Sequence, residues 1–570
     1  MVDLKFSKKI ISIVSSIFVV ILIATSAIWY RHNQSQQNKS TTKQEQILKT
    51  PKAQGKQIVA LNYSKLKIKT AADIYQQKVQ NNLHQQVKKL EKKKNYSFKN
   101  MLILANPYLT STTSLYLHFK TKQPAKISYR VNSGKKIPVF KRTLYNPNGT
   151  YAKNHSYQLI GLISGQKNKI TITATSKNGS KTTKTFTYKA PQLTGKEANH
   201  LKVNTGSSKQ KLSSGLYAFL GDQNLKQRAT YFVDNDGYVR AETPIINYNS
   251  LRLVQHNDQL YFAVNSNQIV KINRLGRMLK SYSTANQGYL IHHDFAVDNS
   301  GNIISLATSL KAKKQEKRVE DQVIKISNRT GKITRLIDFK ELMPDLYKKA
   351  KSIETMSTNK GYHDVIHANT IQLLNHDQIL ISSRETSTIM KISDFETKPK
   401  LDYFISDDSV WKGISNYSNL VLKKENNFIS QAGQHSVTYI PTSQSGVYYL
   451  EMFNNNSAIM HSRLSFKWKN YSGTGGYSVS KKYHSSYYKY LVNENTGSYQ
   501  LVKKIKVPYS PFVGSVQSKD GNVIIDSGMN SKVLEYDQNG KLIKSFSTKG
   551  KVKFLYRVYK YDFENFYFKD

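Results

Sequence analysis

Cysteine is absent from this chain of 570 residues. Without thiols, the protein can form no disulfide, no thiolate metal site, no cysteine nucleophile and no lipid-bearing cysteine anchor. Acidic residues are also scarce, because Asp and Glu number 37 against 86 Lys and Arg, which gives a formal net charge of +49. A surplus of this size predicts anionic neighbours such as a cell wall, a membrane surface or nucleic acid.

Signatures of nucleic-acid binding are missing as well. The basic residues are spread along the whole chain, and there is no RNP pattern, zinc-finger spacing or helix-turn-helix signal. We therefore expect no nucleic-acid partner and interpret the charge as a solvated, lysine-rich surface that suits an anionic wall or membrane. The 38 tyrosines, together with many Thr, Ser, Ile and Val residues, favour strands over helices.

The clearest apolar run lies near the N-terminus. Residues 10–30 contain no charge, three lysines precede them and Arg31 follows. A helix of this length spans a bilayer core of about 30 Å, and the flanking lysines place the N-terminus in the cytoplasm. We expect residues 1–31 to be a single-pass cell-membrane anchor, with the rest of the chain extracellular. A cleaved signal peptide, with small residues at 24–27, is the alternative.

Residues 32–97 are expected to connect this anchor to the folded body. Residues 31–58 are polar and nearly free of large apolar side chains, which is typical of a flexible tether. Between residues 74 and 90, apolar residues recur near helical spacing behind Thr70, a candidate cap. This pattern predicts one long amphipathic helix over residues 70–95, either a stalk or a packing element.

The rest of the chain predicts an all-β fold in two parts. Residues 98–195 show period-two strands separated by Gly and Asn-Gly turns, which favours a small β-sandwich. From 206 to 570 a strand–turn–strand unit recurs, as in "VDNDGYVR", "VDNSGNIISLAT" and "QSKDGNVIIDSG". Such repeats indicate radial blades, and 365 residues suit a six-bladed β-propeller. An irregular array of β-sandwiches is the alternative.

Several of the 14 histidines lie beside predicted blade strands. Equivalent strands of different blades converge on the central channel, so residues distant in sequence can meet there. Three histidines and one arginine at the same phase of their blades would form a cationic, hydrogen-bond-donating cup for a tetrahedral oxyanion such as sulfate or phosphate. The candidate residues of this cup and its surroundings are His292, His293, His367, Asn369, Arg384, Gln434 and His435.

The sequence gives weaker support for other kinds of site. Imidazole and carboxylate at 292–294 could bind a metal, but Arg384 in the same channel would repel a cation, so we expect no metal. Asp294 is expected instead to fix a histidine tautomer through a hydrogen bond. The chain has no G-x-S-x-G elbow for a serine hydrolase and no Walker lysine–serine pair for phosphate binding.

Five stretches of the propeller region resemble a known family in their order and spacing. They are "HHDF", "HDVIHANTIQLLNHDQILISSR", "GQHSVTYIP", "YSPFVGSVQSKDGNVIIDSG" and "VYKYDF". They are similar to the bacterial arylsulfate sulfotransferases, the 3′-phosphoadenylyl-sulfate-independent enzymes. "LILANPYLTSTTSLYLHFKTKQPAKISYRV" resembles the N-terminal sandwich of that family. The resemblance runs from about residue 98 to the end and implies a six-bladed propeller behind a small β-sandwich.

The resemblance also implies an activity. A sulfuryl group would pass from an aryl sulfate donor to a phenol acceptor by a ping-pong mechanism through a sulfohistidine, without a nucleotide donor or other cofactor. His435 is implied as the nucleophile, and His293, His367 and Arg384 as the holders of the sulfuryl oxygens. The additional residues expected at the substrate are His292, a neighbour that could replace His293, with Asn369 and Gln434.

The chain departs from the family in two respects. It lacks cysteine, and its anchor, tether and helix suggest a Gram-positive surface enzyme. The resemblance allows a homodimer, although the extra N-terminal segment could block or replace such a contact. Two other functions stay open at this point. One is a surface-anchored propeller that binds glycans or aryl anions without catalysis, and the other is a sulfatase-like or phosphatase-like hydrolase with water as the acceptor.

Overall fold

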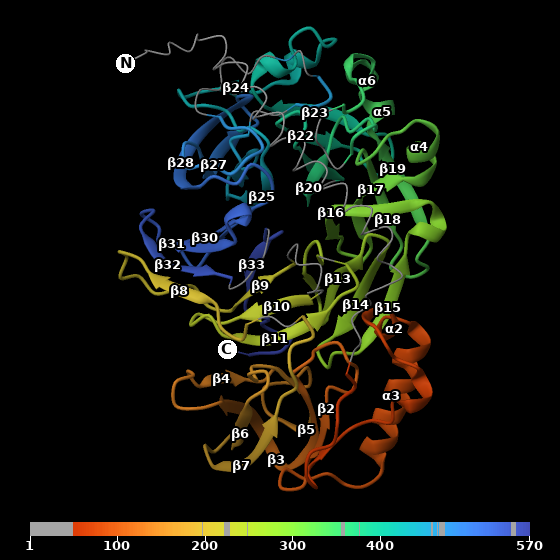
Figure 1. The fold of residues 1–570 in the computed structure, drawn as a ribbon, viewed down its shortest axis with the longest axis vertical. Coiled ribbons are helices and arrows are strands. Elements are labelled where there is room, and N and C mark those ends of the chain that lie inside the picture. Colours follow the sequence, from red (N-terminus) through yellow and green to blue (C-terminus); the bar gives the residue numbers. More distant parts are fainter. Residues whose placement is uncertain are drawn as a thin grey trace, which may run out of the picture.

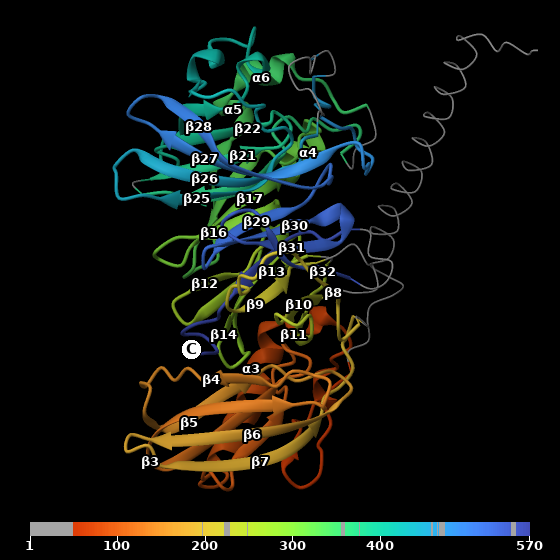
Figure 2. The same ribbon diagram turned by 90° about the vertical axis from the view of Figure 1, so that its left-hand side faces the viewer.

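The computed structural model describes residues 49–569, apart from 196–197, 222–228, 248, 355–358, 376, 458–459, 464–465, 467–473 and 549–553. A strand-rich N-terminal unit lies at one end of a ring of β-sheets (Figure 1). Figure 2 shows the same unit and ring after a turn of 90°. The predicted membrane span and most of the predicted tether lie outside the described residues. Within the described ranges, no helix is both long and apolar enough to cross a bilayer.

The amphipathic segment forms two helices where the sequence pattern predicts one. Helices α2 (Ala71–Ile74) and α3 (Gln77–Lys92) are separated at Tyr75 and Gln76. The helix breaks here because the Tyr75 side chain is buried between the two units, where its hydroxyl donates to the carbonyl of Pro244 at 2.6 Å. The predicted cap is present, since Asp73 Oδ2 accepts from the backbone N–H of Thr70 at 2.9 Å.

Helix α3 joins the sandwich to the propeller through one buried glutamine. Gln80 Nε2 donates to the carbonyl of Tyr108 in the N-terminal unit at 2.9 Å. Its Oε1 accepts from the backbone N–H of Met278 in the propeller at 3.1 Å. Each partner satisfies a polar group that burial would otherwise leave without a hydrogen bond. The helix is therefore a packing element between the two units.

The N-terminal unit is a seven-stranded sheet organised around its longest strand, β3. Residues 115–120 of β3 pair with β2 and β5, whereas residues 125–132 pair with β4 and β6. The end of the expected tether joins this sheet, because β1 pairs in parallel with β2. The strands are β1 (Ile58–Val59), β2 (Leu102–Ala105), β3 (Leu115–Asn132), β4 (Phe140–Thr143), β5 (Ala152–Leu159), β6 (Lys167–Ser176) and β7 (Lys181–Lys189).

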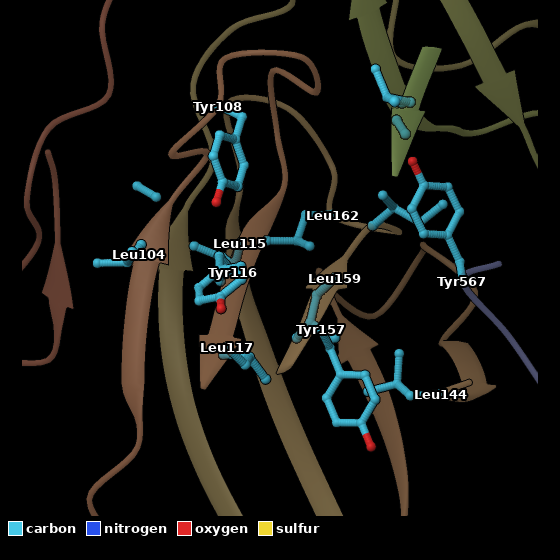
Figure 3. Close-up of a cluster of buried hydrophobic side chains, with 14 of the residues drawn as sticks. Leu104, Tyr108, Leu115, Tyr116, Leu117, Leu144, Tyr157, Leu159, Leu162 and Tyr567 are labelled. Carbon is cyan, nitrogen blue, oxygen red and sulfur yellow. The ribbon is translucent and has the colours of Figure 1, made fainter. Parts of the chain in front are cut away.

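The C-terminal segment of the chain packs into the core of this unit. Leu117 and Leu159 are fully buried there, as is Leu144, and Tyr567 from the C-terminal segment lies beside them (Figure 3). The Tyr567 carbonyl accepts from the backbone N–H of Tyr145 at 3.1 Å. The segment after the last propeller strand thus fastens the propeller to the sandwich.

Six sheets form the ring, which confirms the all-β fold with a six-bladed propeller. The innermost strands of adjacent blades contact one another around the channel. From inner to outer strand, the first three blades are β33 (Val558–Tyr561), β9 (Leu216–Phe219), β10 (Ala229–Val233), β11 (Val239–Pro244); β12 (Val254–His256), β13 (Gln259–Asn265), β14 (Gln268–Asn273), β15 (Met278–Ser283); and β16 (Tyr289–Val297), β17 (Ile303–Ser309), β18 (Gln322–Ile326), β19 (Ile333–Asp338).

Of the three remaining blades, two have an additional outer strand. They are β20 (Ala368–Leu373), β21 (Gln378–Ser383), β22 (Thr388–Ser393), β23 (Lys400–Ile405); β25 (His435–Pro441), β26 (Val447–Asn454), β27 (His484–Asn493), β28 (Ser498–Pro508), β24 (Lys423–Lys424); and β29 (Ser515–Lys519), β30 (Asn522–Ser527), β31 (Lys532–Tyr536), β32 (Leu542–Ser547), β8 (Lys202–Thr205). Short helices in the loops are α4 (Leu310–Gln315), α5 (Phe339–Leu342) and α6 (Pro344–Lys349), with 3₁₀ turns η1 (Ser64–Leu66), η2 (Ala285–Gln287), η3 (Asp408–Val410), η4 (Tyr417–Leu420) and η5 (Gly528–Asn530).

The ring is closed by strands from both ends of the propeller sequence. The C-terminal strand β33 is the inner strand of the first blade and pairs with β9. The N-terminal strand β8 is the outer strand of the last blade and pairs with β32. Two such closures leave the ring with no unpaired seam between its first and last blades, so the channel walls are held in fixed positions.

Candidate active site in the propeller channel

The candidate histidines lie where the inner strands of the blades bulge. Strand β16 loses its regular pairing between Ile291 and Phe295, and β25 does so between His435 and Thr438. At or just before five successive inner strands, one residue has left-handed backbone angles, which are rare outside glycine and cluster at functional sites. These residues are Leu251 (φ 59°), His293 (φ 51°), His367 (φ 48°), Ser436 (φ 57°) and Val513 (φ 55°).

His435 is held in a single tautomer. Its Nδ1 lies 2.7 Å from Oδ1 of Asn455 and 3.0 Å from the carbonyl of Gly433, and both of these atoms are acceptors. The Asn455 amide cannot be reversed, because its Nδ2 donates to the carbonyls of Ser510 at 2.8 Å and Val513 at 3.0 Å. Nδ1 of His435 therefore carries the proton, and Nε2 carries the lone pair.

The surroundings of His435 keep that imidazole neutral. Its side chain is buried, and burial lowers the pKa to about 3. The hydrogen bond that His435 donates to Asn455 opposes this shift, whereas the positive charges of Arg384 and His367 add to it. At neutral pH the Nε2 lone pair is thus available as a nucleophile.

His367 has the opposite charge state. Burial alone would lower its pKa, but the carboxylates of Asp364 and Glu320 outweigh burial and raise it to about 10. The Nδ1 atom of His367 lies 2.6 Å from Asp364 Oδ2 and 2.9 Å from Glu320 Oε2. Because Nδ1 faces the two carboxylates, Nε2 is the atom that can donate to an anion in the channel.

His293 packs directly on His367. The ring centroids of His293 and His367 are 4.8 Å apart. His292 also contacts His293, and the Nδ1 atoms of these two histidines are 2.9 Å apart. Burial lowers the pKa of both His292 and His293, and the charged His367 lowers it further. The structure thus places His293 and His367 in direct contact, and His292 against His293.

Arg384 directly follows strand β21, and its backbone lies beside that of His367. Its backbone N–H donates to the carbonyl of His367 at 3.2 Å, and its Nη2 donates to the hydroxyl of Tyr477 at 2.9 Å. That hydroxyl also hydrogen-bonds Nε2 of His461, whose ring stacks on Tyr477. Burial raises the pKa of the adjacent Glu385 to about 7, against the effect of Arg384. The guanidinium, by contrast, stays charged.

Gln434 and Asn369 hold neighbouring blades together. Both side chains are fully buried. Gln434 Nε2 donates to Ser382 Oγ at 3.0 Å and to the carbonyl of Ser383 at 3.1 Å, and Asn369 Nδ2 donates to the carbonyl of Gln434 at 2.7 Å. These bonds fix the backbone on which His435 is mounted.

The role expected for Asp294 is wrong. Its Oδ1 accepts from Arg557 Nη1 at 3.0 Å and lies 3.1 Å from Arg252 Nε, while its Oδ2 accepts from the backbone N–H of Ile371 at 3.2 Å. The side chain is completely buried and forms ion pairs with Arg252 and Arg557. Asp364 is instead a carboxylate that contacts a histidine, and it helps to keep His367 protonated.

Two site residues escaped the sequence analysis. Asn455 lies in the run Asn454–Asn456, and three successive asparagines at the end of a strand are the signal that could have found it. Glu320 has left-handed backbone angles (φ 58°) in the loop before β18, and the sequence around it carries no motif.

A cavity of about 490 Å³ lies elsewhere, between the sandwich and the propeller. Its lining includes Phe140, Arg142, Asp234 and Arg240 but no histidine. Its charged groups are largely paired within the protein, as Arg240 is with Asp234. We therefore assign the chemistry to the channel, where a neutral histidine and two cations converge.

Two family models match the chain. The model of the family described as "Arylsulfotransferase (ASST)" matches residues 202–567, and that described as "Arylsulfotransferase Ig-like domain" matches residues 102–191. No curated protein matches the chain.

Solved structures share only a distant likeness. A catalytically inactive virginiamycin B lyase from Staphylococcus aureus with quinupristin is 12% identical over 62% of this chain and 90% of its own, at a TM-score of 0.32. A functionally unknown protein from Desulfotomaculum acetoxidans is 9% identical over 61% and 99%, at 0.33. The WD40 domain of Toxoplasma gondii coronin is 9% identical over 62% and 77%, at 0.30. No argument about function follows from likenesses this weak.

Proposed function

The chain belongs to the arylsulfotransferase family, and from this premise we propose that it transfers a sulfuryl group from an aryl sulfate ester to a phenol through a sulfohistidine at His435. One observation carries the proposal. The imidazole of His435 is neutral, its proton is held on Nδ1 by Asn455, and its Nε2 lone pair is free of that bond. This is the state that a nitrogen nucleophile requires.

In the first half-reaction, Nε2 of His435 attacks the sulfur of the donor. The bond between sulfur and the aryl oxygen breaks, and its electron pair leaves with the phenolate. In the second half-reaction the oxygen of the acceptor phenol attacks the same sulfur, the N–S bond breaks, and His435 returns to its starting state. Two successive transfers through one covalent intermediate give ping-pong kinetics. A phenolate leaves readily, so no nucleotide donor is required.

The cations beside His435 would stabilise the charge of the transferring group. Arg384 and protonated His367 can contact the sulfuryl oxygens, and fixed donors in a water-poor site contribute strongly to such transfers. The Nε2–H of His367 can pass its proton to the departing phenolate and recover it from the incoming phenol. His293, packed edge-on against His367, would complete the oxyanion cup.

We also propose that the enzyme acts outside the cell on a single-pass anchor. The support is the uncharged run at residues 10–30, flanked by lysines on one side and Arg31 on the other. The lysine-rich surface of the remaining chain suits an anionic envelope.

The test uses the full chain in mild detergent with 4-nitrophenyl sulfate and no nucleotide. We expect nitrophenolate release that depends on added phenol, and one sulfuryl group on the peptide that carries His435 after a quench in base. Release that proceeds equally without phenol would indicate a hydrolase. A folded protein that neither releases nitrophenolate nor gains mass would be a binding propeller instead.

A further inference from the structure

A compact cluster of imidazoles and carboxylates lies beside the oxyanion cup. Two triads of potential ligand atoms share Glu320, and within each triad all ligand atoms lie within 4.8 Å of one another. The first triad comes from the bulge of β16, and the second from the segment that leads into β20. The members are His292, His293 and Glu320 in one triad, and Glu320, Asp364 and His367 in the other.

Three of these imidazoles turn the same ring atom toward the cluster. Nδ1 of His367 lies 2.9 Å from Glu320 Oε2, and Nδ1 of His293 lies 3.8 Å from the same oxygen. Nδ1 of His292 lies 2.9 Å from Nδ1 of His293. Within each triad, imidazole nitrogens and carboxylate oxygens lie close enough together to share one cation, and these are donor types that transition metals use.

The carboxylates of the cluster are incompletely satisfied. Among the described residues, Asp364 Oδ1 has no hydrogen-bond partner, and the only close contact of Glu320 Oε2 within 3 Å is the ion pair with His367 Nδ1 at 2.9 Å. The Asp364 side chain is completely inaccessible to solvent. Buried carboxylate oxygens normally have partners, so an unbonded Asp364 Oδ1 beside these imidazoles favours a cation at the cluster.

Backbone strain is concentrated on the same residues. His293, His367 and Glu320 all have left-handed angles, with φ of 51°, 48° and 58°. Each such residue costs energy that the surrounding structure must offset, and strain of this kind gathers at functional sites. Here it places three of the five potential ligands from two different blades around one point.

We propose that this cluster binds one divalent transition-metal cation, with Glu320 as its central ligand. Mixed imidazole and carboxylate donors suit Zn²⁺, Mn²⁺ or Co²⁺ better than the all-oxygen sites of Ca²⁺ and Mg²⁺. The cation would displace to solvent the Nδ1 proton that His367 shares with Asp364 and Glu320, and coordination through Nδ1 leaves the remaining proton of His293 and His367 on Nε2. The two imidazoles then still donate into the channel, and the cation removes the repulsion between the two carboxylates and a bound oxyanion.

Arg384 does not prevent this binding. Its guanidinium lies 3.4 Å from Glu385 and donates to Tyr477, so its charge is partly balanced outside the cluster. The sequence expectation of no metal rested on repulsion by Arg384, but it did not include Glu320. The two carboxylates of the cluster, Glu320 and Asp364, bring the negative charge that a cation requires.

The test measures metal binding directly, without any substrate. The full chain in detergent is freed of metal with a chelator and titrated with Co²⁺, whose visible absorption reports coordination, and with Zn²⁺ as competitor. We expect one equivalent to bind. Glu320→Gln, which keeps the side-chain shape, should weaken binding at least tenfold. Glu385→Gln, which changes a buried carboxylate of the same channel outside the cluster, should bind as the unmodified protein does.

Two results would overturn the proposal. One is the absence of a Co²⁺ spectrum and of bound Zn²⁺ in the folded, unmodified protein. The other is equal binding by Glu320→Gln. Asp364→Asn replaces Glu320→Gln if thermal melting shows that the latter does not fold. Because no aryl sulfate is present, the outcome is independent of sulfuryl transfer.

Discussion

Oδ1 of Asn455 lies 2.7 Å from Nδ1 of His435 and fixes which of the two ring nitrogens can attack sulfur. The Asn455 amide is itself fixed by two backbone carbonyls, so the orientation passes from the backbone through Asn455 to the imidazole. This is a positioning role, because Asn455 acts on His435 and not on the substrate.

Replacing Asn455 by alanine should reduce kcat/KM by roughly 10–100-fold, the usual effect of losing a group that orients a reactive imidazole. The tautomer of His435 would no longer be held, so a smaller fraction would present the lone pair on Nε2. Initial rates with 4-nitrophenyl sulfate and phenol measure the effect, and the thermal midpoint shows whether the fold is intact. Unchanged activity in a folded Asn455→Ala protein would contradict the assigned role.

Asn455→Asp separates positioning from packing. A carboxylate at this place would favour the imidazolium form and raise the pKa of His435 from about 3. Activity should then fall as the pH is lowered through the raised pKa, while activity at alkaline pH suffers less. A merely structural role would lower the rate equally at every pH. The measurement is the pH profile of nitrophenolate release for this variant beside the unmodified protein.

The unmodified protein should keep its nucleophile active in mild acid. With a pKa of about 3, His435 stays neutral at pH 5, because an imidazole is protonated only below its pKa. An ordinary histidine of pKa 6.5 would be only about 3% neutral at pH 5, a loss of roughly thirtyfold. We therefore expect the burst of the first half-reaction to change far less than thirtyfold between pH 8 and pH 5. Measurement in Glu385→Gln removes the titration of Glu385 near pH 7.

The sandwich core should contribute to stability without touching the chemistry. Leu117 is completely buried (Figure 3), and replacing such a leucine by alanine costs about 2–5 kcal/mol. Leu117→Ala should lower the thermal midpoint and leave kcat/KM of the remaining folded protein unchanged. Val139→Ala is the matched control, since Val139 is 41% exposed and should change the midpoint little. Equal shifts for both variants would mean that this core does not limit stability.

The blades could be predicted because their turns carry local signals. In the turn at Asp298–Gly301, the backbone N–H of Gly301 donates to the carbonyl of Asp298 at 2.9 Å, and Gly301 has φ of 77°, which favours glycine. The same bond recurs between Gly540 and Asp537 at 3.0 Å. Sequence alone therefore contains the hairpins whose repetition indicates a propeller.

The remaining features depend on residues that meet only in the folded chain. Glu320 reaches His367 from a different blade, and Asn455 reaches His435 across a strand pair, so neither role has a local pattern. The break of the helix at Tyr75 likewise depends on Pro244, a contact 169 residues away. Periodicity predicts elements, whereas these contacts follow from the closure of the ring.

Arg384 gives the sharpest test of the oxyanion cup. Its planar guanidinium can donate to Tyr477 and still direct further N–H groups at sulfuryl oxygens, which a lysine ammonium cannot do in the same geometry. Arg384→Lys should therefore lower kcat/KM on the order of 10²–10³-fold, the effect of removing a transition-state donor. Arg329→Lys, at an exposed turn, is the control and should leave kcat/KM unchanged. If Arg384→Lys retained full kcat/KM while the protein stayed folded, charge at this position would suffice and the forked contact would play no part. If the variant instead raised KM alone, Arg384 would hold the donor equally in ground and transition states.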